Sequence, residues 1–257
     1  MNLKLQIYAL VVLGFLLFCV PVCFSQPQKS QPPIFIAHAG GAVKDKTYTN
    51  SLEALETNYE KGFRFFEVDF SWTSDREVVA IHDWDRSFFE MFFVQVNLKI
   101  PSKVQFLRLK TKSGLTQLSL EDVLKWTQKM GDVFVVTDVK EDNLKVLEKI
   151  PAEYRSNIIP QAYTYQEYDK IVQMGYKKVI LTLYRMKVDH DTVLRFSKDN
   201  SPFAITMHWS VVQQGLANLL QKNNVKVYAH TINDINNLVS LSNMGVFGIY
   251  TDYIVPP

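Results

Sequence analysis

The chain has 257 residues, of which 47% are hydrophobic and 21% are charged. This balance is typical of a globular protein with a buried core, and it excludes disordered and collagen-like chains. The 28 basic residues nearly balance the 26 acidic ones, leaving a formal net charge of +2, so charge gives no case for nucleic-acid binding. The two cysteines are too few for a zinc cluster or a disulfide scaffold.

The beginning of the chain has the features of a secretory signal peptide. Lys4 is its only charge, and an uncharged run follows from Ile7 to Phe24. Cys23 and Ser25 place small residues where signal peptidase would cut after Ser25. The apolar run also reaches the minimum length of a membrane span, so an uncleaved anchor is the alternative.

These signals predict the organisation of the whole chain. We expect a signal peptide over 1–25, a polar and proline-rich linker over 26–33, and one globular domain over 34–257. A chain with this leader is exported, and its destination is the periplasm or the extracellular medium.

Short apolar runs alternate with amphipathic stretches through the rest of the chain. The predicted strands are 34–38, 63–69, 78–82, 133–138, 158–161, 178–183, 203–206 and 225–230. The predicted helices are 51–61, 119–129, 143–150, 165–174, 189–199, 210–222 and 235–243. Strands that alternate with helices of this length indicate a parallel sheet. Eight of them in one domain favour an α/β fold closed into a (β/α)8 TIM barrel.

One stretch, 85–117, interrupts this alternation with little regular pattern. It is an aromatic-rich insertion after strand 3, and its apolar segment runs from Phe88 to Val94. We favour a cap that packs on the barrel, since aromatic side chains pack more often than they contact ligands. The alternative is a lid or an apolar surface, through which Phe88 to Val94 would make transient contact with a membrane surface.

Polar side chains end the first four predicted strands. His38, His82 and Asp138 each close a strand, at the rim where barrel active sites are built. Glu67 and Asp69 are separated by one residue, so they point to the same side of the second strand. Two carboxylates held this close repel each other unless they share a cation or a proton. An all-oxygen site suits magnesium (Mg²⁺) or calcium (Ca²⁺) better than zinc.

A series of short motifs spreads along the chain in a fixed order. The segments are 36–38, 50–54, 67–69, 82–83, 118–124, 138–140, 227–233 and 245–252. This series resembles the glycerophosphodiester phosphodiesterase family, within the phosphatidylinositol-specific phospholipase C-like superfamily. The resemblance implies a TIM barrel, a divalent metal ion and the hydrolysis of phosphodiesters.

The resemblance also implies a role for each polar residue at the rim. His38 is expected to act as general base and His82 as general acid. Glu67, Asp69 and Asp138 are expected to hold the divalent metal, Ca²⁺ or Mg²⁺. Asp138 stands where the family usually has a glutamate, so its shorter side chain predicts a metal contact through water.

Three further residues are expected to contact the substrate. Lys140 is the phosphate-facing lysine of the resemblance, and Gly40 belongs to its first motif. His230 ends the last predicted strand, where a structural hydrogen bond and a substrate contact are both open. The first motif is usually His-Arg-Gly, but Ala39 replaces the arginine here. The guanidinium group that would bind the phosphate through two hydrogen bonds is therefore absent, which leaves the substrate specificity open.

The motif Pro-Glu-Asn-Thr of the resemblance is also altered, because this chain keeps only its asparagine, Asn50, after Tyr48 and Thr49. We expect an exported, metal-dependent phosphodiesterase acting on small glycerophosphodiesters or a related phosphodiester. The alternatives are a phospholipase C/D-like enzyme on lipid headgroups and a catalytically weak barrel that binds a phosphorylated ligand. The presence of both His38 and His82 favours an enzyme, since a pure binder needs no acid–base pair.

Overall fold

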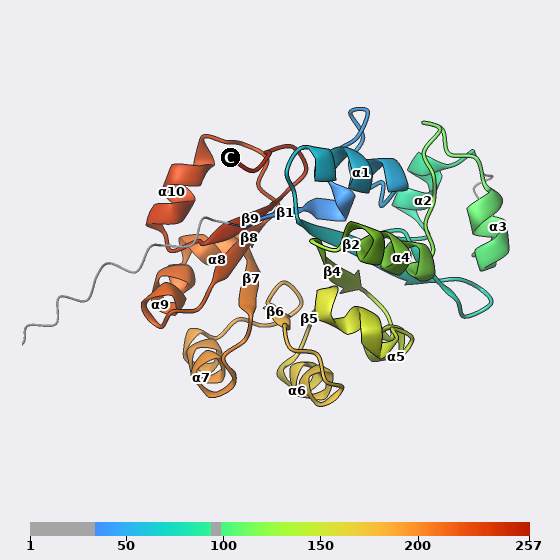
Figure 1. Cartoon of the computed structure of the whole chain (residues 1–257). Coiled ribbons are helices and arrows are strands. Elements are labelled where there is room, and N and C mark those ends of the chain that lie inside the picture. Colours follow the sequence, from blue (N-terminus) through green and yellow to red (C-terminus); the bar gives the residue numbers. More distant parts are fainter. Residues whose placement is uncertain (1–33, 94–98) are drawn as a thin grey trace, which may run out of the picture. The chain divides into compact units, whose positions relative to one another are not determined.

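The computed structural model describes residues 34–93 and 99–257, so the predicted signal peptide and linker lie outside the described residues. Eight parallel strands form a closed barrel (Figure 1). They are β1 (Phe35–Ala37), β2 (Phe65–Trp72), β4 (Phe134–Val139), β5 (Ile158–Ala162), β6 (Ile180–Thr182), β7 (Ala204–His208), β8 (Val227–His230) and β9 (Gly248–Thr251). The barrel closes because β1 pairs with both β2 and β9. The predicted TIM barrel is confirmed.

One predicted barrel strand was wrong. The stretch 78–82 contains β3 (Val78–Ala80), which pairs antiparallel with β2, placing Ala80 opposite Phe70. It therefore lies outside the barrel wall, and β9 supplies the eighth barrel strand. An apolar run alone does not distinguish a hairpin return from a barrel strand, because both are buried.

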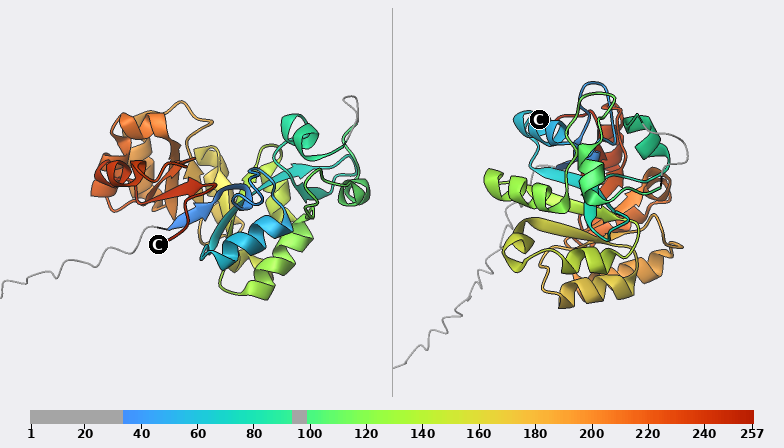
Figure 2. Two further views of the ribbon diagram at one scale, coloured as in Figure 1. Left: turned by 90° about the horizontal axis from the view of Figure 1, so that it is seen from above. Right: turned by 90° about the vertical axis from the view of Figure 1, so that its right-hand side faces the viewer.

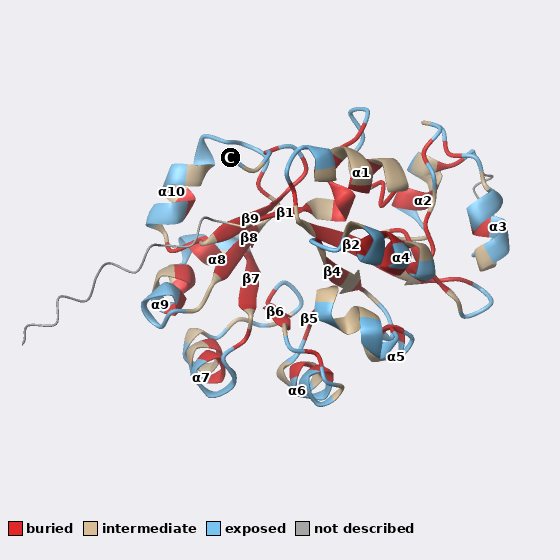
Figure 3. Cartoon of the chain, in the orientation of Figure 1, coloured by how far each residue is buried: buried red, intermediate tan, exposed pale blue. Residues whose placement is uncertain are grey.

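Helices surround the barrel, and each helix packs its buried face against the strands (Figure 3). They are α1 (Leu52–Glu60), α4 (Leu120–Met130), α5 (Asn143–Glu148), α6 (Tyr165–Gln173), α7 (His190–Asn200), α8 (Trp209–Gln213), α9 (Leu216–Lys222) and α10 (Asn237–Asn243). Short 3-10 turns are η1 (His38–Gly40) and η2 (Ala152–Asn157). The single helix predicted over 210–222 is divided, because Gly215 adopts a φ of 88° between α8 and α9.

The barrel interior is filled at the end where the strands begin. Its buried apolar side chains there are Ile36, Val136, Ile159, Ile180, Ala204, Tyr228 and Tyr250. These side chains close that end of the barrel to solvent, so the polar residues that follow the strands gather at the opposite rim.

The insertion contains two helices, which the sequence pattern did not predict: α2 (Arg86–Met91) and α3 (Lys103–Arg108). Both lie beside the β2–β3 hairpin, apart from the ring of barrel helices (Figure 2). Phe88, Phe92 and Phe106 form a small buried core with strand β3. These residues support the expected cap, whereas Phe93 is 76% exposed. Val94 lies outside the described residues.

None of the helices that the structure describes has the length and apolar character needed to cross a membrane.

Candidate active site

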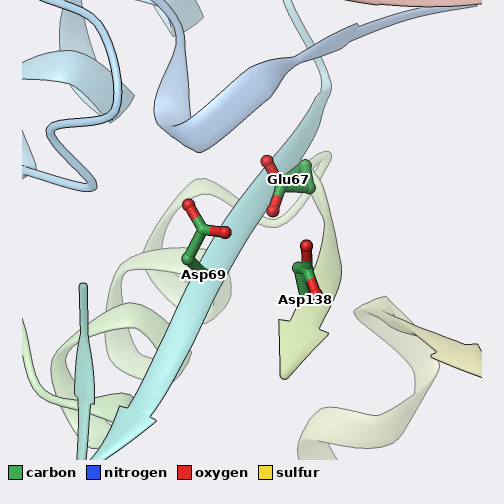
Figure 4. Close-up of side chains that lie close together, drawn as sticks. All are labelled: Glu67, Asp69 and Asp138. Atoms are coloured by element: carbon green, nitrogen blue, oxygen red, sulfur yellow. The ribbon is translucent and has the colours of Figure 1, made fainter. Parts of the chain in front are cut away.

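Three carboxylates from two neighbouring strands meet at the rim of the barrel. Glu67 and Asp69 extend from β2 and Asp138 from β4, and their side chains point toward one another (Figure 4). The strand register places Asp69 directly beside Asp138. One oxygen from each residue lies within 4.8 Å of the others. The structure thus brings together the three residues that the sequence predicted as metal ligands.

Glu67 is the most deeply constrained of the three. Its side chain is 2% exposed, and its Oε2 atom accepts the backbone N–H of Ala39 at 2.7 Å. Burial and the charges of Asp69 and Asp138 raise the pKa of Glu67 well above its ordinary value. Its second oxygen, Oε1, is buried and has no hydrogen-bond partner among the described residues. A buried carboxylate oxygen of this kind requires a hydrogen-bond donor, a proton or a cation as its partner.

Asp69 is held in place by one side chain of the loop before α1. The Nδ2 atom of Asn50 donates to Oδ2 of Asp69 at 2.9 Å, and Oδ1 of Asn50 accepts the backbone N–H of Asp69 at the same distance. Burial and the charge of Asp138 raise the pKa of Asp69. The sequence shows Asn50 as the one retained residue of an altered motif. The structure shows that its side chain positions the carboxylate of Asp69.

The cluster fits a hard divalent cation. All its donors are carboxylate oxygens, which suits Ca²⁺ or Mg²⁺. A bound dication would give Oε1 of Glu67 a partner and would offset the mutual repulsion that raises the pKa values of Glu67 and Asp69. Glu67, Asp69 and Asp138 are therefore the residues that would hold the ion.

Two tyrosines that the sequence analysis did not identify support Asp138. The hydroxyl of Tyr163 donates to Oδ1 of Asp138 at 2.5 Å, and that of Tyr184 donates to the same oxygen at 3.1 Å. They follow β5 and β6, so contacts across neighbouring strands bring them to the carboxylate. No local motif marks such residues.

His38 directly follows β1 and lies between the carboxylate of Asp252, which follows β9, and the acidic cluster. Its Nδ1 atom is 2.9 Å from Oδ1 of Asp252, and its Nε2 atom is 4.0 Å from Oε2 of Glu67. Burial lowers the pKa of His38, but the hydrogen bond and charge of Asp252 outweigh it and hold this pKa above its ordinary value. Asp252 is itself fixed by the Nδ2 atom of Asn233 at 2.7 Å. The pairing directs Nε2 toward the cluster.

His82 reaches the same rim by a different route. The β2–β3 hairpin turns the chain back, so that His82 lies two residues beyond Ala80. Its Nδ1 atom is 2.6 Å from Oδ2 of Asp83. Burial opposes the ionisation of Asp83, yet hydrogen bonds from His82 and Ser87 lower its pKa to about 2. The ionised Asp83 orients the imidazole as Asp252 orients His38.

The Nζ atom of Lys140 contacts Nε2 of His82 and is 3.0 Å from Nδ1. The sequence predicted that Lys140 faces the substrate phosphate. The structure adds a direct contact with the second histidine, which places the ammonium group between β4 and the hairpin.

Tyr48 lies between the two histidines. Its ring meets that of His38 edge to face, with centroids 4.7 Å apart, and that of His82 likewise at 5.2 Å. The residue is 38% exposed, so part of the ring faces the mouth of the barrel. In the sequence, Tyr48 stands out only as a departure from a motif, and nothing there indicates its contact with the two histidines.

Comparison with known proteins connects this geometry to a family. The sequence model of the glycerophosphoryl diester phosphodiesterase family matches residues 39–255. The chain belongs to this family.

Solved structures of similar fold include three bacterial enzymes. A glycerophosphodiester phosphodiesterase from Parabacteroides distasonis is 18% identical, with a TM-score of 0.68 over 86% of this chain and 94% of that one. One from Thermotoga maritima is 18% identical, with a TM-score of 0.67 over 86% and 95%. A phosphodiesterase from Oleispira antarctica, solved with the product sn-glycerol-3-phosphate, is 18% identical, with a TM-score of 0.66 over 86% and 94%. At this identity the likeness concerns the fold.

As a member of the glycerophosphoryl diester phosphodiesterase family, the chain is a phosphoric diester hydrolase. Its first motif is nevertheless unusual in conformation as well as in sequence. Ala39 has a φ of 48° and Gly40 one of 84°, and both are buried. The carbonyl of Gly40 accepts a hydrogen bond from Nδ2 of Asn58 at 3.0 Å, which ties the turn to α1. The turn delivers the N–H of Ala39 to Glu67.

His230 lies at the same rim of this phosphodiesterase, where its ring packs against other aromatic rings. Its ring meets Tyr184 at 5.7 Å and His208 at 6.0 Å between centroids. Burial and the nearby His208 lower the pKa of His230 to about 4. Its buried Nε2 atom has no hydrogen-bond partner among the described residues. Of the two roles expected for His230, a structural hydrogen bond and a substrate contact, the first is not made by Nε2 among the described residues.

Proposed function

We propose that this protein is an exported, metal-dependent phosphodiesterase that hydrolyses glycerophosphodiesters by acid–base catalysis between two histidines. The observation that supports it most is the arrangement of His38 and His82 on either side of Tyr48, each oriented by its own carboxylate. The acidic cluster lies beside His38. A relative of similar fold was solved with sn-glycerol-3-phosphate, which supports a glycerophosphodiester as substrate.

In this proposal the residues divide the reaction between them. Nε2 of His38 takes a proton from the nucleophile, because Asp252 holds Nδ1 and stabilises the imidazolium that forms. His82, oriented by Asp83, gives a proton to the leaving alkoxide. Lys140 supplies positive charge next to His82. A divalent cation held by Glu67, Asp69 and Asp138 would supply neutralisation of negative charge on the phosphoryl oxygens.

Steady-state hydrolysis by the chain after residue 25 tests this function. We would assay glycerophosphocholine, glycerophosphoinositol and bis(p-nitrophenyl) phosphate, each with Ca²⁺, Mg²⁺ or EDTA. We expect metal-dependent turnover that His38→Ala abolishes. His190→Ala, at the start of α7, is the matched control and should keep full activity. Turnover in EDTA, or full activity of His38→Ala, would contradict the proposal.

Export is tested separately, since the proposal takes it from the sequence of the leader. The full chain would be expressed with a C-terminal tag, and the N-terminus of the protein recovered outside the cytoplasm would be sequenced. We expect Gln26 as the first residue. Protein that stays in the membrane fraction with an intact N-terminus would favour the anchor.

A second function, hydrolysis of intact lipid headgroups, is favoured by one feature. Phe93, Ile100 and Val104 are large apolar side chains of the insertion that are 76%, 45% and 53% exposed. Such residues suit contact with a bilayer surface. Co-flotation with anionic liposomes, reduced by Phe93→Ser, would support this function. Failure to bind liposomes would contradict it and leave the water-soluble substrates.

A further inference from the structure

A cavity of about 740 Å³ opens beside His82. Its walls come from three segments that lie apart in the sequence: the loop before α1, helix α2, and residues 111–115 at the end of the insertion. The backbone N–H of Lys112 donates to the carbonyl of Met91 at 2.8 Å. The Nζ atom of Lys44 donates to the carbonyl of Ser113 at 3.4 Å. These contacts join the three segments, and the volume suits one small ligand group.

The cavity lies on the acid side of the site. His82 and Tyr48 line it, whereas Glu67, Asp69 and Asp138 do not. Under the proposed function, on which this inference rests, His82 protonates the leaving alkoxide. The alcohol that leaves must therefore lie within reach of His82, and the cavity is the space next to that residue.

The charges that line the cavity do not balance. Its two carboxylates are engaged: Oε1 of Glu90 accepts from Nε of Arg86 at 2.8 Å, and Asp83 holds His82. Lys46 and Lys112 also line the cavity. Among the described residues, neither has a carboxylate within ion-pair distance. Nζ of Lys112 donates to the carbonyl of Phe89 at 2.8 Å and lies 5.9 Å from the centre of the Phe93 ring. Two cationic residues therefore line this space without a counter-charge.

The remaining lining adds hydrogen-bonding groups to these cations. Hydroxyl side chains line the cavity at Thr47, Thr49, Ser87, Thr111 and Ser113. Those of Thr49, Ser87 and Thr111 already bond Ser51, Asp83 and Leu115 respectively. The aromatic rings in the lining are those of Tyr48 and His82, so among the described residues the cavity holds no aromatic cage for a quaternary ammonium group. Hydroxyls and ammonium groups together suit a polyhydroxylated alcohol with a negative charge.

We propose that the cavity is a subsite for an anionic leaving alcohol. The preferred substrate is then a phosphodiester whose alcohol carries a second anionic group, such as a phosphate monoester, bound by Lys46 and Lys112. This selects against choline-like headgroups, whose positive charge the two lysines repel.

Two substrates that differ by one phosphate test the subsite. We would compare kcat/KM for glycerophosphoinositol and glycerophosphoinositol 4-phosphate. We expect the phosphorylated substrate to be preferred about tenfold, the effect of two partly exposed charge pairs. This preference should fall as ionic strength rises. The double variant Lys46→Met/Lys112→Met should bring the ratio of the two kcat/KM values close to one.

The matched control is the double variant Lys99→Met/Lys110→Met. It removes the same charge from exposed positions of the insertion, but neither residue lines the cavity or joins its walls. It should keep the tenfold ratio. Equal kcat/KM values in the unmodified protein, or equal loss of the preference in both double variants, would overturn the subsite and leave the proposed function standing. Absence of hydrolysis of both substrates would overturn the proposed function and the subsite together.

Discussion

Two regions supply residues to the same rim: the barrel wall, and the segment 73–117 that leaves it after β2, here called the excursion. They differ in burial and in where their residues find partners. His38 follows β1, Glu67 and Asp69 lie within β2, and all three are largely buried and take their partners from other segments of the chain. His82 and Lys112 belong to the excursion, are more exposed, and are held mainly by neighbours within a few residues or by carbonyls. In the proposed function, the barrel wall thus holds the acidic cluster and the general base, while the excursion supplies the general acid and the space for the alcohol.

The largest effect should come from the wall. We expect Glu67→Gln to reduce kcat/KM about a thousandfold or more, because a ligand of the cation is lost. The same variant should melt at a higher temperature than the unmodified protein in EDTA, because it removes a buried charge next to Asp69 and Asp138. Parallel assays and thermal melts measure both effects. Glu141→Gln, on an exposed side chain, is the control, and a Glu67→Gln protein that melts lower in EDTA would contradict the repulsion argument.

The contribution of the excursion should depend on whether the leaving group needs a proton, because His82 is its proposed general acid. We expect His82→Ala to lower kcat/KM on glycerophosphocholine by about 10² to 10⁴, the range of general acid catalysis. On bis(p-nitrophenyl) phosphate the loss should be about tenfold or less, since nitrophenolate leaves without a proton. His38→Ala should lose similar amounts on both substrates. The reverse pattern would exchange the roles of the two histidines.

His230 sharpens the comparison because, among the described residues, it has no carboxylate within ion-pair distance, whereas His38 and His82 each have one. Its pKa of about 4 lies below the unfolded value near 6.5, so the folded state binds fewer protons between these values. Stability should therefore be fully present above pH 6.5 and should fall by about 3 kcal/mol as the pH drops to 4. Urea unfolding across this window measures the slope. His230→Gln should flatten it, and an unchanged slope would assign the loss to other groups.

The smallest effect is expected at Tyr48, where the two regions meet. Burial raises the pKa of Tyr48 to about 12, so its phenol stays neutral in any ordinary assay. We expect Tyr48→Phe to keep kcat/KM within about twofold, while Tyr48→Ala loses about tenfold with the two edge-to-face contacts. A large loss in Tyr48→Phe would instead show that the hydroxyl contacts the substrate.

Sequence patterns predicted the acidic cluster, because polar residues that follow the apolar part of a barrel strand lie near the rim. They did not predict that β2 continues to Trp72. They gave Glu67, Asp69 and Asp138 as one cluster, and the structure places them within 4.8 Å. They could not give the pairing of His38 with Asp252, which is 214 residues away along the chain. Tyr163 and Tyr184 were missed for the same reason, since only barrel closure brings them to Asp138.

The insertion was hard to predict for a different reason. Its aromatic residues pack on β3 and on one another, so they give no helical periodicity against a larger core. Strand β3 itself looked like a barrel strand because Val79 and Ile81 are as buried as wall residues. Only its antiparallel register, set by the turn after Trp72, reveals that it turns away.

The two ends of the insertion meet at a single point of the fold. The backbone N–H of Ala80 donates to the carbonyl of Leu118 at 2.9 Å, so the chain departs from and rejoins the barrel beside the same hairpin. A segment with adjacent ends, outside the closed ladder, can be exchanged between relatives as a cassette without reopening the barrel. Evolution could therefore retarget such an enzyme to a new alcohol by replacing residues 85–117 as one continuous stretch of gene, while His82 and the barrel residues stay in place.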